Sequence, residues 1–274
     1  MPRAPKSLLF AVVFCLSLPF VIAQEGPLDS AKPTGITPEE IIQKFAAKEK
    51  EFRDAREQYT YRQSVKVQTL DGDTVDGEYQ QTFDITFDDQ GHKQKTVVFS
   101  PAPSLQRIMM TSADFDDIEN RLPFVLTSDD VGQYDILYVG QQQEDELHCY
   151  VFDIAPKQID KKLRYFQGRI WVDSQDFQIV KTYGKTIPET RSKKGENLFP
   201  KFTTWRQQID GKYWFPTYTR ADDTLHFQNQ DVRIREIVSY TDYQKFGSKV
   251  KITYAGTEVE KEKQDSNKRQ DNPQ

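Results

Sequence analysis

The side chains that could carry out chemistry are few and scattered along this 274-residue chain. The three histidines, His92, His148 and His226, are far apart in sequence, and no two have the i, i+4 spacing of a helical zinc site. The cysteines, Cys15 and Cys149, form no Cys-x-x-Cys pair. The chain also lacks a Gly-x-Ser-x-Gly elbow, a phosphate-binding glycine loop and a dinucleotide fingerprint. These absences predict a non-catalytic protein that holds no metal and no cofactor.

Carboxylates leave one enzymatic alternative open. The pairs Asp88-Asp89 and Asp129-Asp130 stand where turns and helix caps are expected, so we interpret them as turn and cap residues rather than calcium ligands. The carboxylate pair of a glycoside hydrolase has a geometry that sequence spacing does not reveal. A cluster of buried carboxylates, or a histidine–carboxylate pair in a cleft, would favour a hydrolase.

The first 23 residues have the layout of a secretory signal peptide. Arg3 and Lys6 precede an apolar run over 8–18, and Ala23 provides the small residue before Gln24. The run is too short to span a bilayer, which takes roughly 20 residues. We therefore predict cleavage after Ala23 and a periplasmic or extracellular protein that is not transmembrane after cleavage.

Cleavage would leave Cys149 as the single cysteine of the mature chain, so no internal disulfide could form. On a strand, Cys149 shares a face with Leu147 and Val151, whereas His148 points to the opposite face. A nucleophilic cysteine needs a positioned histidine. We therefore interpret Cys149 as a small buried hydrophobic residue.

The composition excludes some classes of binding partner and suggests a core rich in aromatic side chains. The formal net charge of −5 argues against binding nucleic acid or anionic membrane surfaces through charge. The chain contains 18 Phe, 13 Tyr and 3 Trp, which suit a strand-rich core. Some of these rings could instead line an apolar cavity, because ligand pockets are mostly apolar with few polar groups. Both interpretations stay open at this point.

One amphipathic helix is predicted over about 37–58. Thr37 suits the N-cap, Pro38 the first helical position, and Glu40 follows the cap by three residues. An apolar stripe recurs at helical spacing, and Lys48, Glu49, Glu51 and Arg53 are expected on the polar remainder. The stripe consists of Ile41, Phe45, Phe52, Ala55 and Tyr59. We expect it to pack on the protein's own sheet, with Phe45 and Phe52 as the lid residues that contact a ligand.

From residue 59 onward the apolar period becomes that of strands. Short turns such as Asp210-Gly211 join the predicted strands, so neighbouring strands must be antiparallel. The predicted strands are 59–70, 77–87, 93–100, 134–141, 146–154, 165–172, 177–183, 202–209, 213–220 and 226–243. Residues 101–132 form a partly helical insertion, with Ser112 as a cap, and 185–200 form an exposed loop. The predicted fold class is mainly β: one curved antiparallel sheet, an unclosed β-barrel, whose concave face is covered by the N-terminal amphipathic helix and the insertion. The alternative is a β-sandwich.

The region 134–222 resembles the outer-membrane lipoprotein-sorting proteins, the LolA-like periplasmic carriers and their relatives. The resemblance rests on pattern-level motifs: 150–156 (YVFDIAP), 168–173 (GRIWVD), 177–181 (FQIVK) and 209–216 (IDGKYWFP). In that family an unclosed β-barrel with a helical lid binds acyl chains in its hollow. The resemblance therefore implies a half-barrel that carries a lipid or another hydrophobic ligand.

The predicted organisation is a signal peptide (1–23), a flexible lead-in (24–36), a LolA-like half-barrel domain (37–255) and a disordered polar tail (256–274). The predicted function is that of an exported carrier or binding protein for a lipid or other hydrophobic ligand. The alternative is a structural or interaction module of the cell envelope, with a protein partner and no small ligand. A continuous apolar hollow would favour the carrier, and an interior filled by side chains would favour the module.

Overall fold

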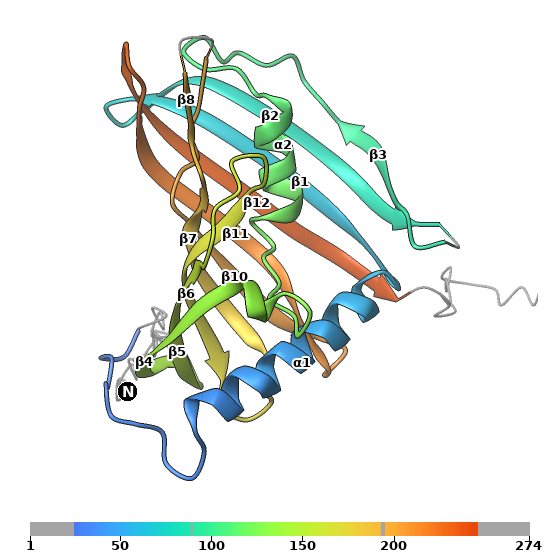
Figure 1. Cartoon of the computed structure of the whole chain (residues 1–274). Helices are drawn as coiled ribbons and strands as arrows, with labels where there is room; N and C mark the ends of the chain where they lie inside the picture. The colour runs from blue at the N-terminus through green and yellow to red at the C-terminus, as the bar shows by residue number, and fades with distance from the viewer. Residues whose placement is uncertain (1–24, 89, 193–194, 246–274) are drawn as a thin grey trace, which may run out of the picture.

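The computed structural model describes residues 25–88, 90–192 and 195–245, so the predicted signal peptide and tail lie outside the described residues. One antiparallel sheet of ten strands dominates the fold, in the order β3-β2-β1-β12-β11-β10-β7-β6-β5-β4 (Figure 1). The end strands β3 and β4 do not pair with each other, so the sheet is not closed. The predicted fold class is confirmed, and the two-sheet sandwich is not.

The elements follow the predicted order along the chain. Helices are α1 (Pro38–Arg56), α2 (Ser112–Asn120) and the short 3-10 helix η1 (Val131–Gln133). Strands are β1 (Tyr59–Asp71), β2 (Thr74–Phe87), β3 (Lys93–Phe99), β4 (Tyr134–Glu144), β5 (Leu147–Pro156), β6 (Tyr165–Asp173), β7 (Ile179–Ile187), β8 (Thr190–Ser192), β9 (Gly195–Asn197), β10 (Phe202–Ile209), β11 (Tyr213–His226) and β12 (Asp231–Lys245). The small β8–β9 pair lies within the stretch that was predicted to be a loop.

Helix α1 begins with the predicted capping box. The Glu40 backbone N–H donates to Thr37 Oγ1 (3.2 Å), and the Thr37 N–H donates to Glu40 Oε2 (2.8 Å). Four members of its predicted apolar stripe are buried beneath the helix: Ile41, Phe45, Phe52 and Ala55. The fifth, Tyr59, lies beyond the end of the helix and is the first residue of β1. Glu49, however, was expected on the polar face and is fully buried. It follows Phe45 by four residues and therefore lies on the same side of the helix.

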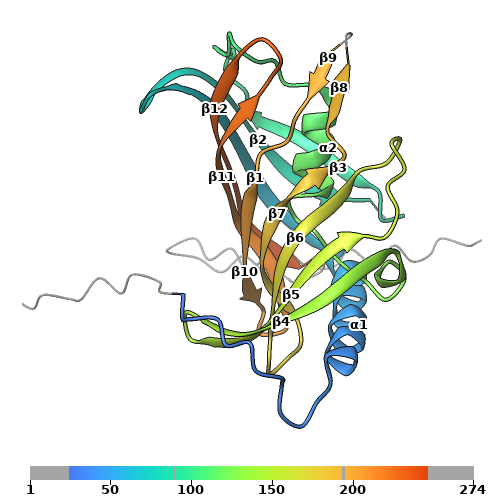
Figure 2. The ribbon, with the colours of Figure 1, turned by 60° about the vertical axis from the view of Figure 1, so that its left-hand side comes forward.

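The insertion between β3 and β4 covers the concave face beyond α1, and Figure 2 shows the sheet curving around α2. Its residues Ile118, Leu122 and Leu126 join the main core. The N-cap of α2 is Thr111 rather than the predicted Ser112, because Thr111 exchanges hydrogen bonds with Asp114 in a second capping box. No helix among the described residues has the length and apolarity needed to span a membrane.

Residues 25–29 lie along the edge strand β4, although 24–36 was expected to be a flexible lead-in. The Asp29 backbone exchanges two hydrogen bonds with Gln141 (2.7 and 2.8 Å). Gly140 permits this close approach, because a Cβ there would lie 2.2 Å from the Asp29 carbonyl oxygen. Lys181 adds ion pairs to Glu144 (2.8 Å) and Glu25 on the same side of the sheet. The segment therefore covers one edge of the open sheet.

Cys149 is buried, as predicted. It packs with Val151, Trp171 and Val180 in a small cluster on the convex face, and burial raises the pKa of its thiol to about 12. The thiol thus stays protonated at neutral pH, which suits a packing role.

Candidate functional site

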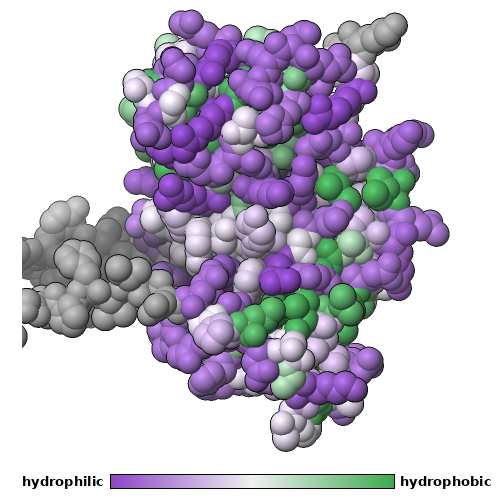
Figure 3. Space-filling model, turned by 90° about the vertical axis from the view of Figure 1, so that its left-hand side faces the viewer, coloured by the Kyte–Doolittle hydropathy of each residue, from purple (hydrophilic) through white to green (hydrophobic). Residues whose placement is uncertain are grey.

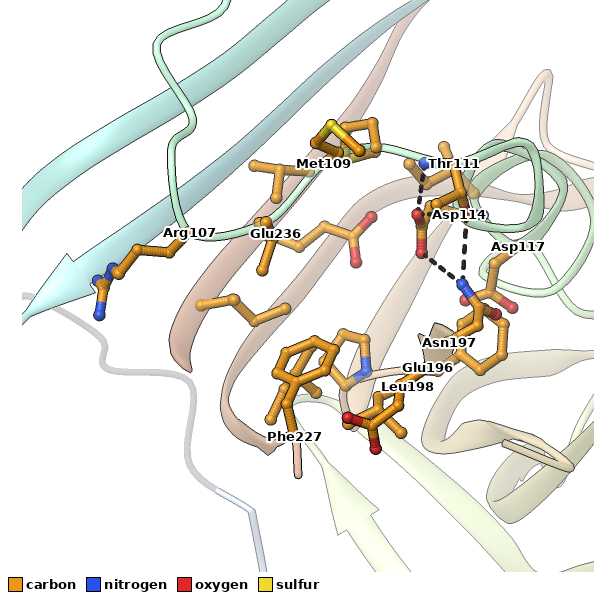
Figure 4. Close-up of a pocket in the computed structure, with 18 of the residues that line it drawn as sticks. Arg107, Met109, Thr111, Asp114, Asp117, Glu196, Asn197, Leu198, Phe227 and Glu236 are labelled. Atoms are coloured by element: carbon orange, nitrogen blue, oxygen red, sulfur yellow. Dashed lines mark hydrogen bonds between the residues drawn. The ribbon is translucent and has the colours of Figure 1, made fainter. Parts of the chain in front are cut away.

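A cavity of about 240 Å³ lies on the concave face between α2 and the sheet (Figure 4). Strands β1, β11 and β12 form one wall, and the segments 107–111 and 196–200 form the others. Apolar side chains dominate the lining, among them Val67, Ile108, Leu198, Leu225, Phe227 and Ile234. Pockets for drug-sized ligands measure roughly 300–1,000 Å³. The cavity is therefore suited to a small ligand.

Glu236 interrupts the apolar inner face of β12. The inward positions of this strand are Val232, Ile234, Glu236, Val238 and Tyr240, all of them buried. The Glu236 side chain is 6% exposed and points into the cavity (Figure 4). No described residue donates a hydrogen bond to its carboxylate or forms an ion pair with it. Burial, and then the charges of Asp117 and Asp114, raise the pKa of Glu236 to about 8.

Asp117 brings a second buried carboxyl group to the cavity from α2. It is 5% exposed and accepts a hydrogen bond from the Thr186 hydroxyl group on β7. Burial raises its pKa to about 7, although the Thr186 hydrogen bond and the charge of Arg121 act in the opposite direction. Two carboxyl groups that are hard to ionise therefore border the same cavity.

Asp114 and Asn197 form a polar edge of the cavity. Asp114 Oδ2 accepts hydrogen bonds from the Thr111 backbone N–H and hydroxyl group, both at 2.7 Å. Asn197 Nδ2 donates to Asp114 Oδ1 (3.4 Å) and Thr111 Oγ1 (3.3 Å). Asn197 Oδ1, by contrast, is buried and receives no hydrogen bond from the described residues. The site thus holds two acceptors that lack donors, the Glu236 carboxylate and the Asn197 amide oxygen.

The predicted ligand contacts Phe45 and Phe52 lie elsewhere, beneath α1. Phe45 is fully buried with its ring centroid 5.7 Å from that of Phe152, and Phe52 packs edge-on against Phe215 at 5.1 Å. Neither residue lines the cavity. Their contact with a ligand stays a prediction.

The same part of the core contains a buried ion pair. Arg206 Nη1 on β10 donates to both carboxylate oxygens of Glu49 (2.9 and 3.1 Å) and to the Ile179 carbonyl oxygen (3.3 Å), and Nη2 donates to the Phe124 carbonyl oxygen. Glu49 also accepts a hydrogen bond from the Ile179 N–H (3.4 Å). Helix α1 is therefore attached to β7, β10 and the insertion.

A larger hollow of about 1,120 Å³ lies on the convex face over β5–β7. Its half-buried and buried charged groups have partners: Arg169 makes a bidentate contact with Asp153 (2.7 and 3.0 Å), and Lys181 pairs with Glu144. The side chains of Asp135 and Lys201 are exposed and pair with no described residue. Figure 3, viewed from the left of Figure 1, shows a mostly hydrophilic surface with separate apolar patches. The unsatisfied acceptors thus favour the concave cavity as the candidate site.

Sequence reasoning missed both buried carboxyl groups. The burial of Glu236 could have been suspected from the sequence, because it shares the alternating face of β12 with apolar residues. The alternation alone, however, does not show which face of the strand is covered. No sequence pattern indicates the burial of Asp117, because the insertion has no regular hydrophobic periodicity. The three histidines are exposed and lie outside the cavity. No group of three His, Cys, Asp or Glu residues in the described part of the chain is arranged to hold a metal ion.

The cluster of buried carboxyl groups is the observation that we expected to favour a hydrolase. Catalytic carboxyl pairs work because their surroundings push the two pKa values apart, so that one group is an acid and the other a base. Here burial raises the pKa of Glu236 and that of Asp117 in the same direction. The two groups therefore lack the widely separated pKa values of such a pair.

No protein-family model and no curated protein matches the chain. Among solved structures, a DUF1329 family protein from Desulfovibrio piger is 17% identical over 77% of this chain and 95% of its own, with a TM-score of 0.38. A LolA superfamily protein from Nitrosomonas europaea is 18% identical over 74% and 94%, with a TM-score of 0.32. The MucA/MucB complex of Pseudomonas aeruginosa is 8% identical over 73% and 98%, with a TM-score of 0.21. The second protein is named for the superfamily that region 134–222 of this sequence resembles.

Proposed function

We propose that this protein is an exported, non-catalytic carrier or binding protein, and that it holds a small hydrophobic ligand in the cavity beneath α2. The observation that carries the proposal is a mostly apolar cavity of about 240 Å³ with an unpartnered, buried carboxyl group on its wall. Protein interiors are close-packed, and a buried polar group without a partner costs stability. An apolar cavity with an unpartnered carboxyl group is typical of a functional site rather than of a well-packed core.

Export is proposed from the sequence of the first 23 residues. A periplasmic or extracellular carrier shields an apolar molecule from water while it diffuses. An open sheet covered by helices on one face supports this role, since it leaves a cavity between the two layers.

The alternative, an envelope interaction module without a small ligand, has its own support. The concave face beneath α1 is filled by side chains, among them Phe45, Phe52 and Phe152. A module of this kind would bind a protein partner through its surface and would hold no small molecule.

The two functions can be separated with the mature chain and a neutral fluorescent apolar probe, N-phenyl-1-naphthylamine. We expect wild-type protein to bind the probe, and Ile234→Trp to suppress binding because the larger side chain fills the cavity. Leu163→Trp is the matched control, since Leu163 is 54% exposed and lines neither the cavity nor the hollow on the convex face. Circular dichroism checks that each variant is folded.

Native mass spectrometry of protein purified from the envelope provides a second measurement. A retained small molecule in wild-type protein, absent from Ile234→Trp, would support the carrier. Wild-type protein that binds no probe and retains no small molecule would contradict the carrier and leave the envelope module.

A further inference from the structure

The polar groups of the cavity accept hydrogen bonds far more than they donate them. The carboxyl groups of Glu236, Asp117, Asp114 and Glu196 line it, together with the Asn197 amide oxygen. Arg107 is the one cationic side chain among the residues that line it, and it pairs with Asp76 at 2.7 Å. Glu196 pairs with Arg191 and accepts from the Gln228 N–H. Within the described part of the chain, the buried cavity atoms without a hydrogen-bond partner are the two acceptors, the Glu236 carboxyl group and Asn197 Oδ1, and one donor, Arg107 Nε. The Arg107 guanidinium is already neutralised by Asp76, and its side chain points away from Glu236 (Figure 4).

This excess of acceptors discriminates between ligands by charge. An anionic ligand such as a fatty acid would bring a further negative charge into a poorly solvated space beside several carboxyl groups. An uncharged apolar ligand would leave the Glu236 carboxyl group buried without a hydrogen-bond partner. An ammonium group offers three N–H donors and a compensating positive charge. A hydrogen bond between two charged groups is stronger than one between neutral groups.

The walls favour an organic cation over a metal ion. Leu225, Phe227 and Ile234 offer apolar contact area, which a hydrated metal ion does not use. The described residues hold no cluster suited to a metal. The cavity volume restricts the ligand, or the part of it that enters, to a small size.

We propose that the ligand is a small alkylamine: its ammonium group binds the Glu236 carboxylate, with Asn197 Oδ1 as a further acceptor, and its alkyl chain contacts the apolar wall formed by β11 and β12. This inference rests on the proposed function, because it names the chemical class of ligand for the same cavity. Glu236 acts as the residue that selects the charge of the ligand.

The test compares three ligands that share one alkyl chain, hexylamine, 1-hexanol and hexanoate, by isothermal titration calorimetry at pH 8.5. At this pH hexylamine is largely protonated, and Glu236 can ionise. We expect hexylamine to bind at least about tenfold more tightly than 1-hexanol, as a charged hydrogen bond provides, and hexanoate to show no binding.

The Glu236→Gln variant keeps the size of the side chain and removes its charge. We expect it to bind hexylamine at least about tenfold more weakly and 1-hexanol within about twofold of wild type. Glu146→Gln is the matched control, because Glu146 is exposed and lies outside the cavity. The ligand series on wild-type protein is informative even where Glu236→Gln fails to fold.

The outcomes separate this inference from the proposed function. Binding of 1-hexanol or hexanoate as tight as that of hexylamine, or unchanged hexylamine binding by folded Glu236→Gln, overturns the amine and leaves a hydrophobic ligand in the cavity. Failure of all three ligands and of N-phenyl-1-naphthylamine to bind overturns both.

Discussion

Glu236 places a carboxyl group among the apolar side chains of the inner face of β12. Ionising a carboxyl group there costs free energy, because the charge loses its hydration and gains no partner. Burial and the neighbouring carboxylates of Asp117 and Asp114 accordingly raise the pKa of Glu236 to about 8. In the absence of a ligand the group is therefore mostly protonated at neutral pH, and an ammonium ion would favour its ionised form.

This pKa predicts that the ligand-free protein loses stability as the pH rises from about 5 to 8. The pKa of Glu236 increases from 4.5, the ordinary value, to about 8 on folding. Between these values the folded state keeps a proton that the unfolded state has lost, so the free energy of unfolding falls by up to about 1.4 kcal/mol per pH unit. Urea unfolding at pH 5, 6, 7 and 8 measures this slope.

The variant Glu236→Gln should have a clearly smaller slope over the same interval and should be more stable than wild type at pH 8. Asp117, with its pKa raised to about 7, contributes a slope of the same sign that stays in the variant. Glu146→Gln is the control and should keep the wild-type slope. Identical slopes in wild type and Glu236→Gln would show that Glu236 titrates normally.

Single residues differ in how far the sequence predicts them. Cys149 is correctly predicted to be buried, because its neighbours on the same strand face are apolar. Glu49 is wrongly predicted to be exposed, because its partner Arg206 is 157 residues away and no local pattern links the two. Glu236 and Asp117 meet only through the packing of α2 on the sheet. Buried polar residues are thus identified by their tertiary partners rather than by their type.

At the scale of elements, the Glu49–Arg206 pair connects α1 to the sheet and to the insertion. Removing one partner leaves an unpaired buried charge, so Glu49→Ala should cost about 3–5 kcal/mol of unfolding free energy. Arg206 would also lose the acceptor that holds it near the Phe124 and Ile179 carbonyl oxygens. Urea unfolding at pH 7 measures the effect.

A double variant makes this prediction specific to the ion pair. Glu49→Leu combined with Arg206→Met should cost less than the sum of the two single changes, with a coupling of about 0.5–3 kcal/mol. Glu51→Ala is the control on the exposed face of α1, where Glu51 pairs with Lys48, and should change stability by no more than about 0.5 kcal/mol. Additive effects of the Glu49 and Arg206 changes would argue against a stabilising pair.

Most elements could be predicted from the sequence, because their signals are local. The capping box of α1, the alternation of the strands and turns such as Asp210-Gly211 involve residues close in the chain. The pairing of residues 25–29 with β4 and the β8–β9 pair were missed, since such short segments become ordered through contacts with distant parts of the sheet. The α2 cap was displaced by one residue because Thr111 and Ser112 are both good caps.

At the scale of the whole molecule, the concave face of the sheet has two parts. Beneath α1 the aromatic side chains fill the space, and beneath α2 a cavity is left. The sequence predicts a covered concave face, but whether side chains fill it depends on residues from strands far apart in the chain. One molecule therefore combines the filled interior expected of an envelope module with the cavity expected of a carrier.

This division predicts that stability and binding can be changed separately. Phe45→Ala should cost about 3–5 kcal/mol, because Phe45 is fully buried in packed core, and should leave hexylamine binding within about twofold of wild type. Ile234→Trp should abolish hexylamine binding at a smaller cost in stability, because the new side chain enters an existing cavity. Urea unfolding and calorimetry provide the two measurements.

Hexylamine is the appropriate ligand for this comparison. The space created by Phe45→Ala could take up a neutral apolar probe, as dry engineered cavities do, whereas an ammonium ion would be poorly accommodated there. Phe52→Glu extends the test, since it introduces a charge beneath α1 and should destabilise the fold without a specific effect on binding. If folded Phe45→Ala instead lost hexylamine binding while Ile234→Trp retained it, the ligand would lie beneath α1, and the predicted role of Phe45 and Phe52 as lid contacts would be correct.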